Sequence, residues 1–308
     1  MPKINSIKDA AVIFPSFQNL DFIFNTFMFL EVHTLKSIEA EFYIAIVGII
    51  LTVFHVFVLT RKSMLMSSII SVMIGIGICD IASMLLAISM KHLIYNFYRD
   101  ECTPPFSLFT YRLFWILMHL RDDFIRCSTW LGVIMASIRF MALRFVSRPS
   151  FKRVTYLSFG FFATLIIFMI SSIISILNSN RTKIIETGTW TAGASCEARS
   201  NETWILHELR VSDMFAANNG LLLRIVVFIN AVLSRILPCI LLPILTLALI
   251  LEIRRARKTM ITSSFSVRKR TERTTALVIF MAGTFFIASL PAGVFSLFQV
   301  MYTDVGFL

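Results

Sequence analysis

The chain has 308 residues, of which 57% are hydrophobic and only 15% are charged, with a mean hydropathy of +0.79 and a net charge of +11. Soluble domains carry about 25% charged residues, so this composition excludes a water-soluble globule of this length. The apolar residues fall in long blocks, so the positive charge indicates basic loops beside anionic lipid rather than a nucleic-acid partner.

The first 41 residues are expected to form an extracellular tail. The opening residues are polar and lack the basic start and short apolar run of a cleavable signal peptide. The stretch 11–32 is rich in phenylalanine, but Asn19, Asp21 and Asn25 interrupt it. We interpret this stretch as part of the tail, with an amphipathic segment or an additional span as the alternatives.

Six later blocks are apolar and long enough to cross a bilayer, which takes about 18 residues of helix. They are residues 42–60, 64–90, 110–145, 154–177, 219–251 and 274–298. A backbone facing lipid must satisfy its own hydrogen bonds, so these spans should be helices. The prediction is an all-α membrane protein with one bundle over 42–298, followed by a short remnant at 299–308 that is too short to cross again.

Basic residues set the expected orientation. They gather after the first, third and fifth spans, at 61–62, 139–153 and 254–273, whereas the alternate loops carry mixed charges. Because loops rich in Lys and Arg stay in the cytoplasm, the N-terminus should lie outside the cell. The prediction is a multi-pass protein of the plasma membrane.

Two kinds of signal in the predicted external loops agree with this orientation. Cys102 and Cys196 lie in those loops, where an oxidising exterior favours a disulfide, although two unpaired cysteines are the alternative. Asn180 and Asn201 each begin an N-glycosylation acceptor in the loop after the fourth span.

Asp80 is an ionisable residue in the middle of the second span. A carboxylate there costs roughly 2.5–3.5 kcal/mol on insertion scales, so it should face the bundle interior. The structural interpretation is a packing group with polar partners. The functional interpretation, which we favour, is a sodium- or proton-sensitive switch.

The third span carries an unusual number of polar groups. The candidates for a ligand pocket are Trp115, His119, Arg121, Asp122, Asp123 and Arg126. Most of them share one broad helical face, and the spacing of Asp122 and Arg126 suits an ion pair, whereas Arg121 points to the opposite face. A helix with charge on both faces cannot have lipid on either, so this span should be central. Two interpretations of these groups are retained: a structural network whose charges neutralise one another, and a ligand pocket.

Prolines interrupt two spans, and no residues suggest catalysis. Pro238 and Pro243 lie in the fifth span and Pro291 lies in the sixth. Each proline removes a backbone hydrogen bond, which gives either a hinge or passive curvature. We find no nucleophile with a base, no phosphate loop and no metal-ligand spacing, so we expect neither an enzyme nor a bound cofactor.

The combined pattern resembles the rhodopsin-like G-protein-coupled receptors. Its marks are Asp80, Arg139 at the end of the third span, Pro238, and FFIASLP at 285–291. More narrowly, several strings resemble nematode serpentine receptors of class W, which are related to FMRFamide-type peptide receptors. These strings are LTRKSM at 59–64, IGIGICD at 74–80, ECTPP at 101–105, RCSTWLG at 126–132 and LPCILLPILT at 237–246.

The resemblance implies a seven-helix receptor bundle with six spans present. It also implies an extracellular peptide ligand, a heterotrimeric G protein as partner and, in some settings, a receptor dimer. By the same resemblance, Arg139 would engage the G protein and Asp80 would be the interior sodium-site acid. Pro238 and Pro291, with Phe285, would form the activation hinges, and Cys102 would pair with Cys196.

The sequence departs from the family pattern in two informative ways. Ile138 precedes Arg139 where the wider superfamily has an acid, and the seventh span with its Asn-Pro-x-x-Tyr motif is missing. The alternatives are therefore a truncated, non-signalling receptor form and, from a different class, a polytopic transporter or channel. Against the transporter, the chain lacks the paired half-repeats and short broken helices of many transporter folds.

Overall fold

The computed structural model describes residues 19–61, 67–97, 103–145, 154, 156–191, 203–259, 283, 286–287, 290–291, 293–298 and 300–301. Four predicted site residues, Cys102, Cys196, Asn201 and Phe285, lie outside these residues. Most of the predicted span 274–298 also lies outside them, although its described positions are helical.

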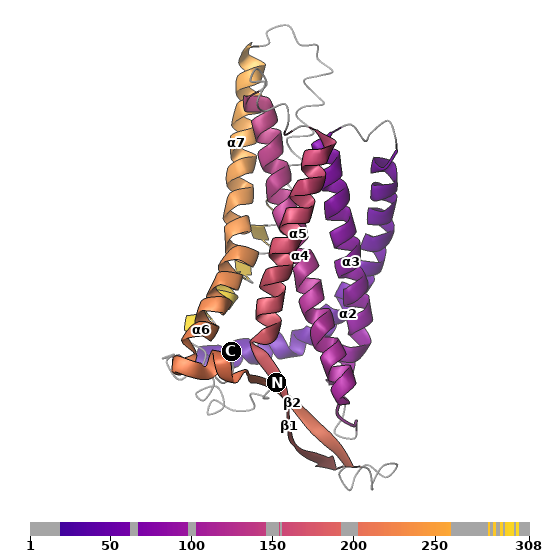
Figure 1. Cartoon of the computed structure of the whole chain (residues 1–308), viewed down its shortest axis with the longest axis vertical. Helices are drawn as coiled ribbons and strands as arrows, with labels where there is room; N and C mark the ends of the chain where they lie inside the picture. Colours follow the sequence, from indigo (N-terminus) through magenta and orange to yellow (C-terminus); the bar gives the residue numbers. More distant parts are fainter. Residues whose placement is uncertain are drawn as a thin grey trace.

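Long helices run up and down in serpentine order (Figure 1). In chain order the elements are α2 (Leu20–Leu59), α3 (Ser68–Phe97), α4 (Leu108–Arg144), α5 (Leu157–Asn180), β1 (Thr182–Thr191), β2 (Thr203–Val211), α6 (Asp213–Ala231), the π-helix η2 (Val232–Ile236) and α7 (Leu237–Thr259). The last three helical elements follow one another without a gap and together cross the bundle. We call the end that carries β1 and β2 the hairpin end, and the other end the opposite end.

Five helical segments within the described residues are long and apolar enough to cross a membrane. They are Lys36–Leu59, Ser68–Lys91, Leu108–Ala142, Leu157–Asn180 and Asp213–Arg255. Large apolar side chains point outward from them, such as Ile44 and Phe54, which are 71% and 68% exposed. In water such exposure would be unfavourable, whereas lipid solvates it. The helical membrane bundle predicted from the sequence is confirmed.

Helix α2 begins well before the predicted first span. Asn19 caps its N-terminus, because the side chain of Asn19 accepts a hydrogen bond from the backbone N–H of Phe22 at 3.2 Å. Asp21 in the first turn complements the helix dipole. The early part of α2 runs across the long axis of the bundle at the hairpin end (Figure 1). The polar residues that seemed to interrupt a span therefore start a helix outside the membrane segment.

Helix α4 is central, as its charged faces predicted. It packs against α3, α5 and α7. The apolar cluster between α3 and α4 is formed by the buried residues Val72, Cys79, Cys127, Leu131 and Ile138. Ile138 is thus a packing residue in the position where an acid was expected.

Small residues let neighbouring helices approach closely, as is common in membrane bundles. A Cβ atom added to Gly160 of α5 would lie 2.5 Å from the backbone oxygen of Ser68 in α3. A Cβ atom at Gly77 would lie 2.4 Å from a methyl group of Val56, which brings α3 and α2 together. These crossings hold α5 close to α3 and α3 close to α2.

The strands β1 and β2 form an antiparallel hairpin that the all-α prediction missed. The register pairs Thr182 with Val211 and Thr191 with Thr203, with an irregularity between Glu186 and Gly188. Two contacts fix the hairpin to the bundle: the backbone N–H of Ser212 donates to the carbonyl of Arg181 at 2.8 Å, and Lys183 pairs with Asp213 at 2.6 Å. The β-branched and aromatic residues of 182–191 and 203–211 carried this signal in the sequence.

Candidate functional site

Arg126 of α4 is buried at the junction of three helical elements, with only 4% of its surface exposed. Its Nη1 donates to the carbonyl of Ser171 at 2.9 Å and to Oγ of Ser175 at 3.2 Å, both on α5. Its Nε donates to Oγ of Ser234 on η2 at 2.8 Å. The hydroxyl of Ser234 in turn donates to Oδ1 of Asn230 at 2.7 Å. One guanidinium therefore joins α4, α5 and η2.

Asp123, the neighbouring carboxylate, faces α5 and is 3% exposed. Its Oδ2 accepts a hydrogen bond from Ser172 at 3.0 Å, and its backbone carbonyl accepts one from Ser171 at 3.1 Å. Its Oδ1 is buried without a hydrogen-bond partner in the described part of the chain. The serines of α5 thus provide hydrogen-bond partners for both Asp123 and Arg126 of α4.

The predicted ion pair between Asp122 and Arg126 is wrong. Within the described ranges, the four salt bridges do not include it, and the guanidinium of Arg126 points to serines instead. The physical reason is tertiary. Helical spacing brings the two side chains within reach, but Ser171, Ser175 and Ser234 offer acceptors in the buried interior, where an unsatisfied guanidinium would be costly.

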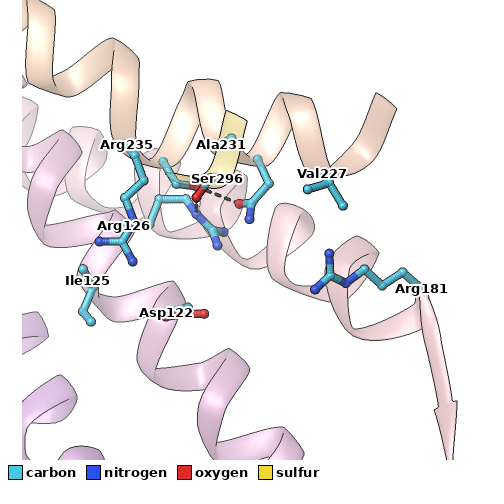
Figure 2. A pocket seen from close by; sticks show the side chains of 10 residues that line it. Asp122, Ile125, Arg126, Arg181, Val227, Ala231, Arg235 and Ser296 are labelled. Carbon is cyan, nitrogen blue, oxygen red and sulfur yellow. Dashed lines mark hydrogen bonds between the residues drawn. The ribbon is translucent and has the colours of Figure 1, made fainter. Parts of the chain in front are cut away.

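A pocket of about 180 Å³ lies beside this junction, among α4, the hairpin-proximal end of α5, and α6 with η2 (Figure 2). Its lining residues are Asp122, Ile125, Arg126, Arg181, Val227, Asn230, Ala231, Ser234, Arg235 and Ser296. Three guanidinium groups thus meet one carboxylate. Burial lowers the pKa of the Arg181 guanidinium, and the nearby Asp122 carboxylate partly offsets this effect. Arginine stays protonated under such shifts, so the pocket is cationic.

The structure brings only two of the six predicted pocket residues to this cavity, Asp122 and Arg126. Arg121 instead forms an ion pair with Glu41 of α2. Trp115 and His119 stack edge to face, with ring centroids 4.7 Å apart, and the buried nitrogens Nε1 of Trp115 and Nε2 of His119 have no hydrogen-bond partner among the residues described. These three side chains lie on α4 but do not line the pocket.

Sequence reasoning missed Arg181 and Arg235 as pocket residues. Arg235 lies three residues before Pro238 inside an apolar span, so its charge within a membrane helix was the available signal. Arg181 directly follows α5 and gave no comparable signal, because a basic residue at the end of a span is ordinary.

Comparison with known families agrees with this serpentine arrangement of helices. The family described as "Serpentine type 7TM GPCR chemoreceptor Srw" matches residues 39–308. The chain belongs to this family of serpentine receptors. A search of curated proteins found no match. The receptor is therefore a multi-pass membrane protein of a family that responds to ligands and couples to G proteins, and it is not an enzyme.

Asp80 of the receptor lies at the contact between α3 and α4. Its Oδ1 accepts a hydrogen bond from Oγ of Ser128 at 2.6 Å. A half-buried carboxylate with a hydroxyl partner fits both interpretations of this residue, the packing group and the ion-sensitive switch. Its role as a switch stays a prediction.

The receptor has an irregular helix next to Pro238. In η2 the backbone N–H of Leu237 bonds to the carbonyl of Val232, which leaves the carbonyl of Leu233 without its α-helical donor. The indole Nε1 of Trp130 on α4 donates to this carbonyl at 2.9 Å. Pro238 lacks an N–H, so the ladder is weakened there as well. Trp130 therefore holds the π-helical part of the fifth span against α4.

We expect Trp130→Phe to lower the free energy of unfolding by about 1 kcal/mol, because the carbonyl of Leu233 would lose its donor in the bundle interior. Thermal unfolding of the purified receptor in detergent measures this change. Trp190→Phe, on the hairpin, is the matched control. Equal effects of the two substitutions would contradict a specific role for Trp130.

At the opposite end, Arg144 of α4 pairs with Glu252 of α7 at 2.7 Å. The same carboxylate lies 3.7 Å from Arg255. Arg139, about one turn earlier on α4, is half-buried and has no ion-pair partner within the ranges that the structure describes. The ends of α4 and α7 at the opposite end are thus tied together close to Arg139.

Proposed function

We propose that the receptor recognises an extracellular peptide at the hairpin end and activates a heterotrimeric G protein at the opposite end, from the plasma membrane. The observation that carries this proposal is the cationic pocket among α4, α5, α6 and η2. An unfilled polar cavity inside a membrane bundle is unfavourable, and bound water or a bound ligand lowers its cost. The presence of this pocket therefore favours a binding role.

Two features support an external hairpin end. Four described basic residues lie at helix ends of the opposite end, namely Arg61, Arg144, Arg254 and Arg255, whereas the hairpin end has basic residues mixed with acids such as Glu186 and Asp213. Asn180, the last residue of α5, is exposed at the hairpin end and begins a glycosylation acceptor. The positive-inside rule places basic residues on the cytoplasmic side, and N-glycosylation in the secretory pathway requires an acceptor on the external side.

We expect the receptor expressed in eukaryotic cells to carry glycans that a glycosidase removes, with a corresponding gain in gel mobility. Asn180→Gln should abolish one such step and Asn201→Gln another, because each removes one acceptor. Asn230→Gln, on α6 within the bundle, is the control and should leave the mobility unchanged. A wild-type receptor that reaches the cell surface with a cytoplasmically labelled hairpin would contradict the orientation.

The proposed mechanism is a population shift. A ligand that contacts α4 and η2 and binds more tightly to one relative position of these elements shifts the population of receptors toward that position. Pro238 and Pro291 provide flexible points, and the ion pair between Arg144 and Glu252 must rearrange for the inner ends to separate. Separation exposes Arg139 to a G-protein helix.

The test is ligand-stimulated nucleotide exchange in membranes that contain the receptor and a heterotrimeric G protein. Both the 308-residue chain and a version with an added seventh apolar helix are challenged with a broad neuropeptide panel. We expect at least one peptide to accelerate exchange, and Arg139→Ala to abolish the acceleration while Arg112→Ala retains it. Absence of any response from both versions would overturn the proposal.

A further inference from the structure

The pocket has an excess of positive charge that the described residues do not neutralise. The side chains of Arg181 and Arg235 make no hydrogen bond or ion pair with the described residues, and Nε of Arg181 is buried without a partner among them. Arg126 donates hydrogen bonds to serine groups, and the buried carboxylate of Asp123 offsets its charge, so the excess positive charge belongs to Arg181 and Arg235. The single acid of the lining, Asp122, lies at the exposed side. An uncompensated guanidinium in a partly desolvated site favours an anion.

The side chains of Arg181 and Arg235 line the same pocket from two different helical elements. Arg181 comes from the end of α5 and Arg235 from η2, and Figure 2 shows them approaching the pocket from different sides. A guanidinium presents paired donors that match the two oxygens of a carboxylate. Because the arginines belong to different helical elements, an anion between them would also couple α5 to η2.

The remaining lining limits the size and character of the bound group. A volume of about 180 Å³ accommodates one residue or an end group rather than a whole peptide. Ile125, Val227 and Ala231 add apolar surface beside the arginines. A carboxylate attached to a short apolar side chain meets both requirements.

We propose that this pocket binds a carboxylate of the ligand, held by Arg181 and Arg235, with the adjacent apolar side chain against Ile125 and Val227. This inference rests on the proposed function for its ligand site and extends it to a chemical class. The free C-terminus of a peptide and a small carboxylic acid share this chemistry, and an amidated C-terminus lacks it.

The experiment measures binding by the thermal stabilisation of purified receptor, which needs no G protein. The probes are two matched pairs: N-acetylleucine with N-acetylleucinamide, and a hexapeptide ending in leucine as the free acid or the amide. We expect the acids to stabilise the receptor and the amides to bind at least about tenfold more weakly, because each lost charge-assisted contact is worth this much or more. Binding of only the peptide acid would identify a peptide terminus as the source, and binding of both acids would show that a small acid suffices.

Arg181→Gln and Arg235→Gln should each weaken acid binding about tenfold, whereas Arg112→Gln, an exposed arginine on α4, should leave it unchanged. Equal stabilisation by acids and amides, unchanged binding in both pocket variants, or no acid binding at millimolar probe would overturn the inference. Acid binding without stimulated nucleotide exchange would refute the signalling proposal alone. Exchange stimulated only by amidated or cationic peptides would refute the carboxylate site alone.

Discussion

Replacing Arg126 with methionine is expected to lower the free energy of unfolding of the receptor by about 3 kcal/mol. The substitution removes the donors to Ser171, Ser175 and Ser234 in one step. It also removes the guanidinium whose charge interacts with the buried carboxylate of Asp123. Methionine fills a similar volume, so the loss reports the polar contacts rather than a cavity.

Thermal and denaturant unfolding in detergent measure this loss, and Arg112→Met is the matched control. Arg112 lies on the same helix but is exposed, so its substitution should change stability by less than about 0.5 kcal/mol. Where the single variant does not fold well enough to measure, the double variant Asp123→Asn/Arg126→Met provides the second test. We expect it to be more stable than the single variant, because it removes the charge that lost its partner. Indistinguishable Arg126→Met and Arg112→Met variants would refute the buried junction.

The spans could be predicted because their signal is large and local. A window of apolar residues long enough to cross lipid does not depend on what packs beside it. The central position of α4 followed in the same way, because charge on both faces leaves no face for lipid. The family resemblance, carried by strings spread over the chain, is likewise confirmed over 39–308.

The pocket could not be predicted from one helix, because it is built from several. The spacing of Asp122 and Arg126 is local information, whereas the serines that redirect Arg126 come from positions about 45 and 108 residues further along the chain. Arg181 and Arg235 meet only after α5 and η2 are placed. Helical periodicity predicts which side chains share one face of a helix. It does not predict which residues of neighbouring helices pack against that face.

The hairpin and the early start of α2 were missed for a different reason. The polar residues within 11–32 suggest an interrupted stretch, and the mixed charges after the fourth span suggest a loop. Asn19 instead caps a helix, and the polar residues of β1 are interspersed with β-branched and aromatic ones along a partly exposed ribbon. The strong hydrophobicity of the neighbouring spans outweighs the weaker helix and strand signals of these two segments, so the sequence predicts a tail and a loop there.

Replacing Gly160 with alanine is expected to destabilise the receptor by about 1–3 kcal/mol, although the substitution adds one methyl group and favours the helix itself. The new Cβ would lie 2.5 Å from the carbonyl oxygen of Ser68 and 2.9 Å from Cβ of Ser71. The first of these atoms belongs to the backbone of α3, so a rotamer change cannot relieve the clash. The helices α3 and α5 must therefore move apart.

The matched substitution is Gly132→Ala on α4, where an added Cβ meets no heavy atom within 4 Å. It should be neutral or stabilise by up to about 1 kcal/mol, because alanine loses less backbone entropy than glycine in a helix. If Gly160→Ala and Gly132→Ala shift the unfolding temperature equally, α3 and α5 do not make the close crossing at Gly160 and Ser68.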